Sequence, residues 1–191
     1  MNRLASRFVD RGAITAAYVG IGMAVTIAIS FLLIIPIEPI VWLLALPSGM
    51  LIGYYADQRS DRRAGPWSRI LVNGLFAAAV TGLTMAVLLL AVKGLFFTVD
   101  NGYRDPGLGG QLTCQAGADC VYQRYLDLGR GPEFEAIGVT DAASFAGFYW
   151  AEQLKVAGLV LGITTLGGLV GAGLYGFTRS RAASSETSAT I

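Results

Sequence analysis

Histidine is absent from the 191-residue chain, and charged residues make up only 14% of it. The lack of histidine removes the commonest general base and metal ligand of proteins. No glycine-rich phosphate loop, nucleophile elbow or zinc-ligand spacing occurs in the sequence either. We therefore expect no catalytic residues, no metal site and no cofactor, and a function other than that of an enzyme.

The low charge also bears on the class of protein. Ordinary soluble domains carry about 25% charged residues. This chain has fewer, and it contains four long apolar runs. Apolar stretches of about 18 or more residues are typical of membrane spans. The sequence predicts an all-α integral membrane protein with four transmembrane helices and one long extracytoplasmic loop between helices 3 and 4. Its formal net charge of +1 gives no reason to expect nucleic acid as a partner.

The expected segments follow the chain in order. They are a basic cytoplasmic N-terminus at 1–12, transmembrane helices 1–3 at 13–97 with a cytoplasmic loop at 57–69, an extracytoplasmic loop at 98–150, transmembrane helix 4 at 151–178 and a disordered cytoplasmic tail at 179–191.

Two of these segments need further comment. The second apolar run, 40–56, is near the lower length limit for a span and contains Pro47, so a re-entrant hairpin is an alternative there. The fourth helix is expected to begin before the hydrocarbon, because Thr140 and Asp141 offer an N-cap. No proline or other strong breaker follows until Thr178.

Basic residues predict the orientation of the chain. Lysine and arginine gather in the cytoplasmic segments of membrane proteins. With both termini inside, the cytoplasmic side carries most of them, namely Arg3, Arg7, Arg11, Arg59, Arg62, Arg63, Arg69, Arg179 and Arg181. The strong preference for arginine over lysine, with abundant alanine and glycine, suggests a GC-rich bacterial genome. We expect a multi-pass protein of the bacterial plasma membrane.

The loop at 98–150 holds both cysteines, Cys114 and Cys120. Outside the cytoplasm such a pair most simply forms a disulfide, with a redox pair or a metal site as alternatives. Gly117 would allow the small ring to turn. After it, residues 120–128 show the pattern of a short amphipathic helix that ends at Gly129.

Small residues recur every four positions in three of the apolar runs. Such stripes let helix backbones approach closely, because lipid supplies no hydrophobic drive between helices. They predict either packing inside one bundle or an interface with a partner, and the positions singled out are Gly74, Gly82, Gly158, Gly162, Gly167, Gly168, Gly171 and Gly176.

Aromatic residues crowd the start of the fourth helix, at Phe145, Phe148, Tyr149 and Trp150. An interfacial aromatic belt explains them most simply. The alternative is an outer docking face for an extracytoplasmic partner.

The layout of four spans, both termini inside and a long disulfide-bearing loop resembles that of the tetraspanins. The Cys-Cys-Gly motif of that family's large loop is missing here. The resemblance is therefore one of topology, and it implies no site residues.

Taken together, these features favour a non-catalytic accessory, assembly or scaffold subunit of a larger bacterial membrane complex. Its expected partners are membrane lipids and either other membrane subunits or further copies of the chain. The alternative is a small permease or channel-like protein for a neutral or lipidic substrate. That alternative predicts a cavity lined by hydroxyl groups, for which the candidates are Thr26, Ser30, Thr81, Thr84, Thr164 and Thr165.

Overall fold

The computed structural model describes residues 9–34, 38–60, 66–99 and 114–188. These residues form helices and connecting turns, with no strand among them. The helices in chain order are α1 (Arg11–Ala28), the π-helix η2 (Ile29–Ile34), α2 (Glu38–Gln58), α3 (Trp67–Thr98), α4 (Ala118–Asp127), α5 (Gly131–Ala136) and α6 (Ala142–Ser188).

Four of these helical segments are long and apolar enough to cross a membrane: Arg11–Leu32, Pro39–Gln58, Trp67–Thr98 and Ala142–Arg179. The predicted class, an all-helical membrane protein with four spanning helices, is confirmed at this level. The protein is a multi-pass membrane protein.

The second of these segments is a single helix. α2 runs through Pro47 without interruption, although proline removes one backbone hydrogen bond from a helix interior. A re-entrant hairpin over 40–56 would need a turn in the middle of this segment, and the structure has helix there instead. The hairpin alternative is therefore not what this chain forms.

α6 is the longest element, with 47 residues, or about 70 Å at 1.5 Å per residue. It begins where the sequence predicted, because the Asp141 carboxylate accepts the backbone N–H of Ser144 as an N-cap (2.7 Å). It continues as helix to Ser188, where disorder was predicted from residue 179 onward. No glycine or proline follows Gly176, so nothing local stops the helix from propagating.

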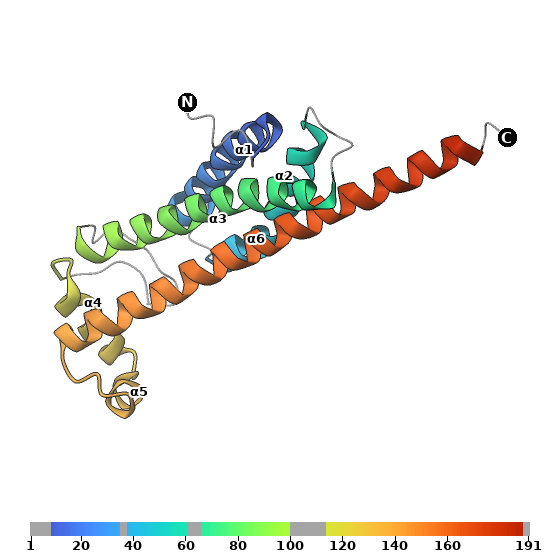
Figure 1. The fold of residues 1–191 in the computed structure, drawn as a ribbon. Coiled ribbons are helices and arrows are strands. Elements are labelled where there is room, and N and C mark those ends of the chain that lie inside the picture. The colour runs from blue at the N-terminus through green and yellow to red at the C-terminus, as the bar shows by residue number, and fades with distance from the viewer. Residues whose placement is uncertain (1–8, 35–37, 61–65, 100–113, 189–191) are drawn as a thin grey trace.

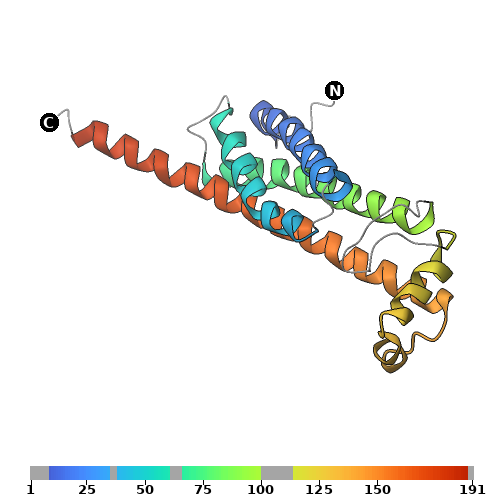
Figure 2. The ribbon, with the colours of Figure 1, turned by 180° about the vertical axis from the view of Figure 1, so that it is seen from behind.

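The spanning helices form one bundle, seen from opposite sides in Figures 1 and 2. α6 packs along both α2 and α3, and α1 packs against α3 and α2. The last turns of α6 project past the other helices toward the C-terminus. We call the end with the starts of α1 and α3 the basal end, and the opposite end, which carries α4 and α5, the cap end.

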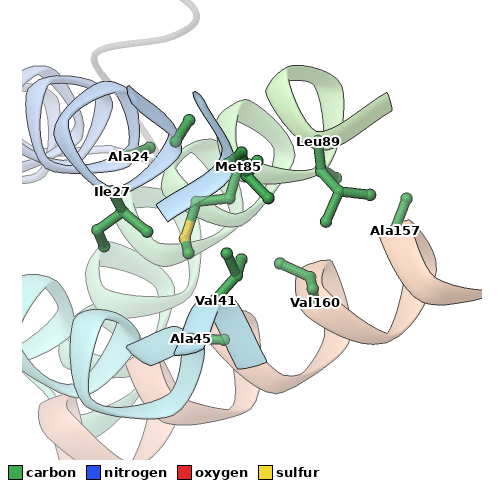
Figure 3. Packing of buried hydrophobic residues seen from close by; sticks show 11 residues of the cluster. Ala24, Ile27, Val41, Ala45, Met85, Leu89, Ala157 and Val160 are labelled. Carbon is green, nitrogen blue, oxygen red and sulfur yellow. The ribbon is translucent and has the colours of Figure 1, made fainter. Parts of the chain in front are cut away.

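The largest buried cluster lies where all four long helices meet, and Figure 3 shows it from close by. Met85 and Leu89 of α3 lie between Ile27 of α1, Val41 of α2 and Val160 of α6. Alanines fill the closest approaches, including Ala24, Ala45 and Ala157. Small side chains at the crossings bring the helices close together, as expected where van der Waals packing must hold a bundle in lipid.

Candidate functional site

A compact aromatic cluster builds the cap end. Phe134 of α5 and Phe145 of α6 are each only 1% exposed, and their rings meet edge to face with centroids 5.5 Å apart. Tyr122 and Tyr125 of α4 lie against both phenylalanines. These rings, with Val121 and Val139, form a small core separate from that of the bundle.

The residues singled out as an outer docking face belong to this core. Phe145 is buried at its centre, and Phe148 lies edge to face against Phe134 at 5.8 Å. Tyr149 stacks on Phe97 of α3 at 4.6 Å, and Trp150 meets the same ring at 5.7 Å. The four aromatic residues therefore hold the cap onto α3 and α6, and Phe145 presents no surface to a partner.

The disulfide lies directly before the cap core. Cys114 and Cys120 are bonded, with their Cα atoms 5.7 Å apart, as the sequence predicted. Cys120 stands in the first turn of α4 and is buried. Gly117 between them has φ +144°, a backbone angle that side chains other than that of glycine rarely adopt. The bridge pins the start of α4 beside the aromatic core.

α5 is an element that the sequence analysis missed. It is one short helix, Gly131–Ala136, with Pro132 in its first turn and Glu133 beside it. Proline in the first turn and an acidic residue there are helix-start signals, so the sequence did contain the clue. Arg130, just before the helix, covers the rings of Tyr125 and Phe134 at 5.2 and 5.5 Å and pairs with Glu133 at 3.0 Å.

Inside the bundle, one set of α6 glycines lies against the backbones of α2 and α3. A Cβ on Gly171 would lie 2.9 Å from the Tyr54 nitrogen, and one on Gly168 would lie 2.9 Å from the Gly74 oxygen. Real Cβ atoms essentially never approach heavy atoms this closely, so glycine is needed at both positions. The same holds for Gly74 of α3 and Gly167 of α6, whereas Gly82 of α3 lies against Thr164 and Leu161 of α6 at 3.0–3.2 Å and Gly176 lies against the Trp67 ring.

α2 supplies glycines to the same contact that the sequence analysis did not single out. A Cβ on Gly53 would lie 2.7 Å from the Gly168 Cα, and one on Gly49 would lie 3.1 Å from the Gly168 nitrogen. Their spacing of four residues is the same signal that marked the other stripes.

A second set of α6 glycines faces away from the chain. Gly147, Gly158, Gly162 and Gly173 have nothing within 4 Å of an added Cβ. Gly147 and Gly158, and likewise Gly162 and Gly173, are about three helical turns apart, so the four share one face of α6. We call this surface the open glycine face. Large apolar side chains flank it, among them Leu154 and Leu166, which is 61% exposed.

The buried hydroxyl groups of the bundle bond to their own helices. Thr81 donates to the Ala77 carbonyl at 2.9 Å, and Thr164 donates to the Val160 carbonyl at 2.7 Å. Both threonines are fully buried, and Thr164 lies against Gly82 in the α3–α6 contact. Thr26, Thr84 and Thr165 also donate within their helices. Five of the six candidate lining residues therefore donate their hydroxyl group to a carbonyl of their own helix.

Polar residues gather at the basal end, in a cluster that the sequence analysis missed. The Asn73 side chain of α3 accepts the backbone N–H of Asp10 through its Oδ1 at 3.2 Å, and Asp10 also accepts the hydroxyl of Ser60. Asn73 also acts as a side-chain hydrogen-bond partner of Asp57, in the last turn of α2. Asn73, as an amide within an apolar run, was the available signal. We call Asp10, Asp57, Ser60 and Asn73 the basal polar cluster.

Charge outside this cluster is mostly exposed. Lys155 and Glu152 of α6 pair at 2.6 Å, with their side chains 69% and 42% exposed. In the described part of the chain, no three cysteine, aspartate or glutamate residues gather so as to hold a metal ion. At the start of α6, the Ser144 backbone N–H donates to the Asp141 carboxylate and lowers its pKa below the usual value.

Comparison with known proteins gives no relative for this chain. No family model matches it, and neither a curated protein nor a solved structure does so.

Proposed function

We propose that the protein is a non-catalytic accessory, assembly or scaffold subunit of a larger bacterial membrane complex. The open glycine face of α6 is the observation that carries the proposal. The other α6 glycines are already packed against α2 and α3, whereas Gly158 and Gly162 lie on an exposed helix surface with nothing within 4 Å of an added Cβ. Glycines four residues apart on a membrane helix allow a second helix to approach closely.

The neighbouring side chains fit such a partner. Leu154, Leu159 and Leu166 flank the glycines and are all exposed, so a helix packed over the glycines would contact leucine on both sides. In lipid, close van der Waals contact of this kind drives helix association. The partner we propose is a transmembrane helix of another subunit of the complex.

The alternative function, a small permease or channel for a neutral or lipidic substrate, is less well supported. It needs a continuous passage lined by hydroxyl groups, yet Thr81 and Thr164 bond to their own helices and are fully buried. Gly20 of α1 lies directly against the Thr81 side chain. These contacts favour the subunit over the permease.

We further propose that the basal end faces the cytoplasm of a bacterial cell and the cap end lies outside. The arginine distribution supports this orientation, and so does the disulfide at the cap end, since disulfides persist in oxidising compartments. This orientation is tested with reporters fused after residue 191, one active only in the cytoplasm and one active only in the periplasm. A periplasmic signal would contradict the proposed orientation.

Partner binding is tested with the double variant Gly158→Leu/Gly162→Leu, purified in a gentle detergent and run on a blue-native gel. The wild type should migrate in a complex whose components mass spectrometry identifies, and the variant should migrate as the lone chain because leucine side chains block the close approach of a second helix. Gly22→Leu on α1, another glycine with nothing within 4 Å, is the matched control and should leave the complex intact. A wild type that migrates as a lone chain, or only with copies of itself, would contradict the proposal.

A further inference from the structure

The basal polar cluster holds a carboxylate whose charge the described residues do not compensate. Asp57 is 2% exposed, and its Oδ2 is buried without a hydrogen-bond partner. A buried ionised group without a partner is costly, and proteins usually pair it or bind a metal ion to it. Asp57 therefore differs from Asp10, since both carboxylate oxygens of Asp10 accept a hydrogen bond.

Asp10 is the N-cap of α1. Its Oδ1 accepts the backbone N–H of Arg11 at 2.6 Å and its Oδ2 accepts the Ser60 hydroxyl. A carboxylate at a helix N-terminus is also stabilised by the helix dipole. Asp10 is thus a hydrogen-bonded carboxylate next to Asp57, on which it acts electrostatically.

The position of Asp57 in α2 disfavours a negative charge on its carboxylate. It lies in the last turn of α2, where the helix dipole places partial negative charge. The neighbouring cation, Arg59, is directed to Tyr55: its Nε donates to the Tyr55 hydroxyl at 3.0 Å and its guanidinium covers that ring at 5.4 Å. Among the described residues, no ion pair joins a basic side chain to Asp57.

The groups around the two carboxylates are oxygen donors of the kind that hard cations prefer. They include the Ser60 hydroxyl, which donates to the Asp10 carboxylate, and the Asn73 amide oxygen, which accepts from the Asp10 backbone. Magnesium is commonly bound through one or two carboxylates while it keeps several of its waters. Two carboxylates also match its charge.

We propose that the basal polar cluster binds a divalent cation of the magnesium class, with Asp57 and Asp10 as its charged ligands. The ion joins the start of α1, the end of α2 and, through Asn73, the start of α3. Its binding would fix these three helix ends relative to one another. This site lies on other helices than the open glycine face, so either proposal can fail without the other.

The test uses the full chain in nanodiscs of zwitterionic phosphatidylcholine, whose headgroups add no net charge that would gather divalent ions. Thermal unfolding is followed by circular dichroism with Mg²⁺ or with EDTA at equal ionic strength. A ligand that binds only the folded state raises its stability by mass action, and at about a hundredfold excess over Kd we expect Tm to rise by about 5–10 °C. The rise in Tm should vanish in Asp57→Asn. It should persist in the matched control Glu135→Gln, which removes an exposed carboxylate of the cap.

Direct binding is measured with Mn²⁺ by electron paramagnetic resonance, which does not depend on any variant. One saturable site on the wild type is expected. Asp10→Asn, in which asparagine can still cap α1, should weaken it by about tenfold or more; this variant serves if Asp57→Asn does not fold. Absence of a saturable Mn²⁺ site would overturn the proposal. An equal rise in Tm in the wild type and all variants would also overturn the proposal, because the stabilising ions would then bind elsewhere on the protein.

Discussion

Gly82 of α3 lies so close to Thr164 of α6 that a Cβ added to the glycine would be 3.0 Å from the threonine Cβ. The Thr164 hydroxyl donates to the Val160 carbonyl of its own helix, while its Cβ lies against Gly82. The contact shows how this bundle is held together: a small residue on one helix receives a hydroxyl-bearing residue whose polar group is already satisfied.

Gly82→Val is expected to destabilise the bundle. The added side chain meets Thr164 and Leu161 at 3.0–3.2 Å from its Cβ, and overpacking of this kind costs about 1–3 kcal/mol. Reversible unfolding in mixed micelles measures the loss. Gly22→Val places the same side chain at a glycine with open space around it and should change stability much less, so equal losses in the two variants would contradict the packing described here.

Phe134→Ala is expected to unfold the cap while leaving the spanning helices in place. Phe134 is 1% exposed and touches the rings of Tyr122, Tyr125, Phe145 and Phe148. Truncating such a residue costs about 3–5 kcal/mol, more than a small satellite core tolerates. Limited proteolysis should cut the variant within α4 and α5, with the bundle fragments intact. Leu128→Ala, at a side chain that is 46% exposed, should be cut no faster than the wild type.

Removing the disulfide should loosen α4 rather than unfold the bundle. The ring between Cys114 and Cys120 is short, and the loop-entropy relation gives such a ring a stabilisation of about 2 kcal/mol. Hydrogen exchange of the double variant Cys114→Ser/Cys120→Ser should therefore quicken in α4 and stay unchanged in α2 and α3. Loss of protection throughout the spanning helices would show that the bridge does more than pin the cap.

The start of α6 should depend on pH through Asp141. Hydrogen bonds from Ser144 lower the Asp141 pKa, so the carboxylate stabilises the folded helix start. That contribution is fully present above the pKa of aspartate in the unfolded chain, and it is lost as the pH falls through the lower folded-state pKa. The protection of the first α6 amides, corrected for the intrinsic pH dependence of exchange, should fall on acidification. In Asp141→Asn, which caps without titrating, the exchange of these amides, corrected for the intrinsic pH effect, should show no such step.

Much of this architecture follows from local sequence. The spanning helices Arg11–Leu32 and Trp67–Thr98 were predictable within 13–97 because hydropathy and length act within each segment, and the N-cap at Asp141 was readable for the same reason. The pairing of Cys114 with Cys120 also followed from proximity in the chain. The short α5 was missed, since a single helical turn has too little periodicity to stand out.

The use of each glycine was decided only by tertiary structure. Gly158 and Gly162 have the same spacing as Gly167 and Gly171, yet the first pair is open and the second is packed against α2. Which face of α6 meets a neighbour depends on how the helices cross, and no single segment contains that information. The same holds for Phe145, which became core because α4 and α5 fold over it.

The sequence by itself determined that this is a membrane protein of four spanning helices. Each span must satisfy its backbone hydrogen-bonding groups within its own helix and be apolar along its length, because lipid offers no partners, and both requirements are visible in the local sequence. Tertiary structure decided what the distant polar residues do. Asp10, Asp57 and Asn73 are far apart in the chain and became neighbours only when the ends of three helices came together.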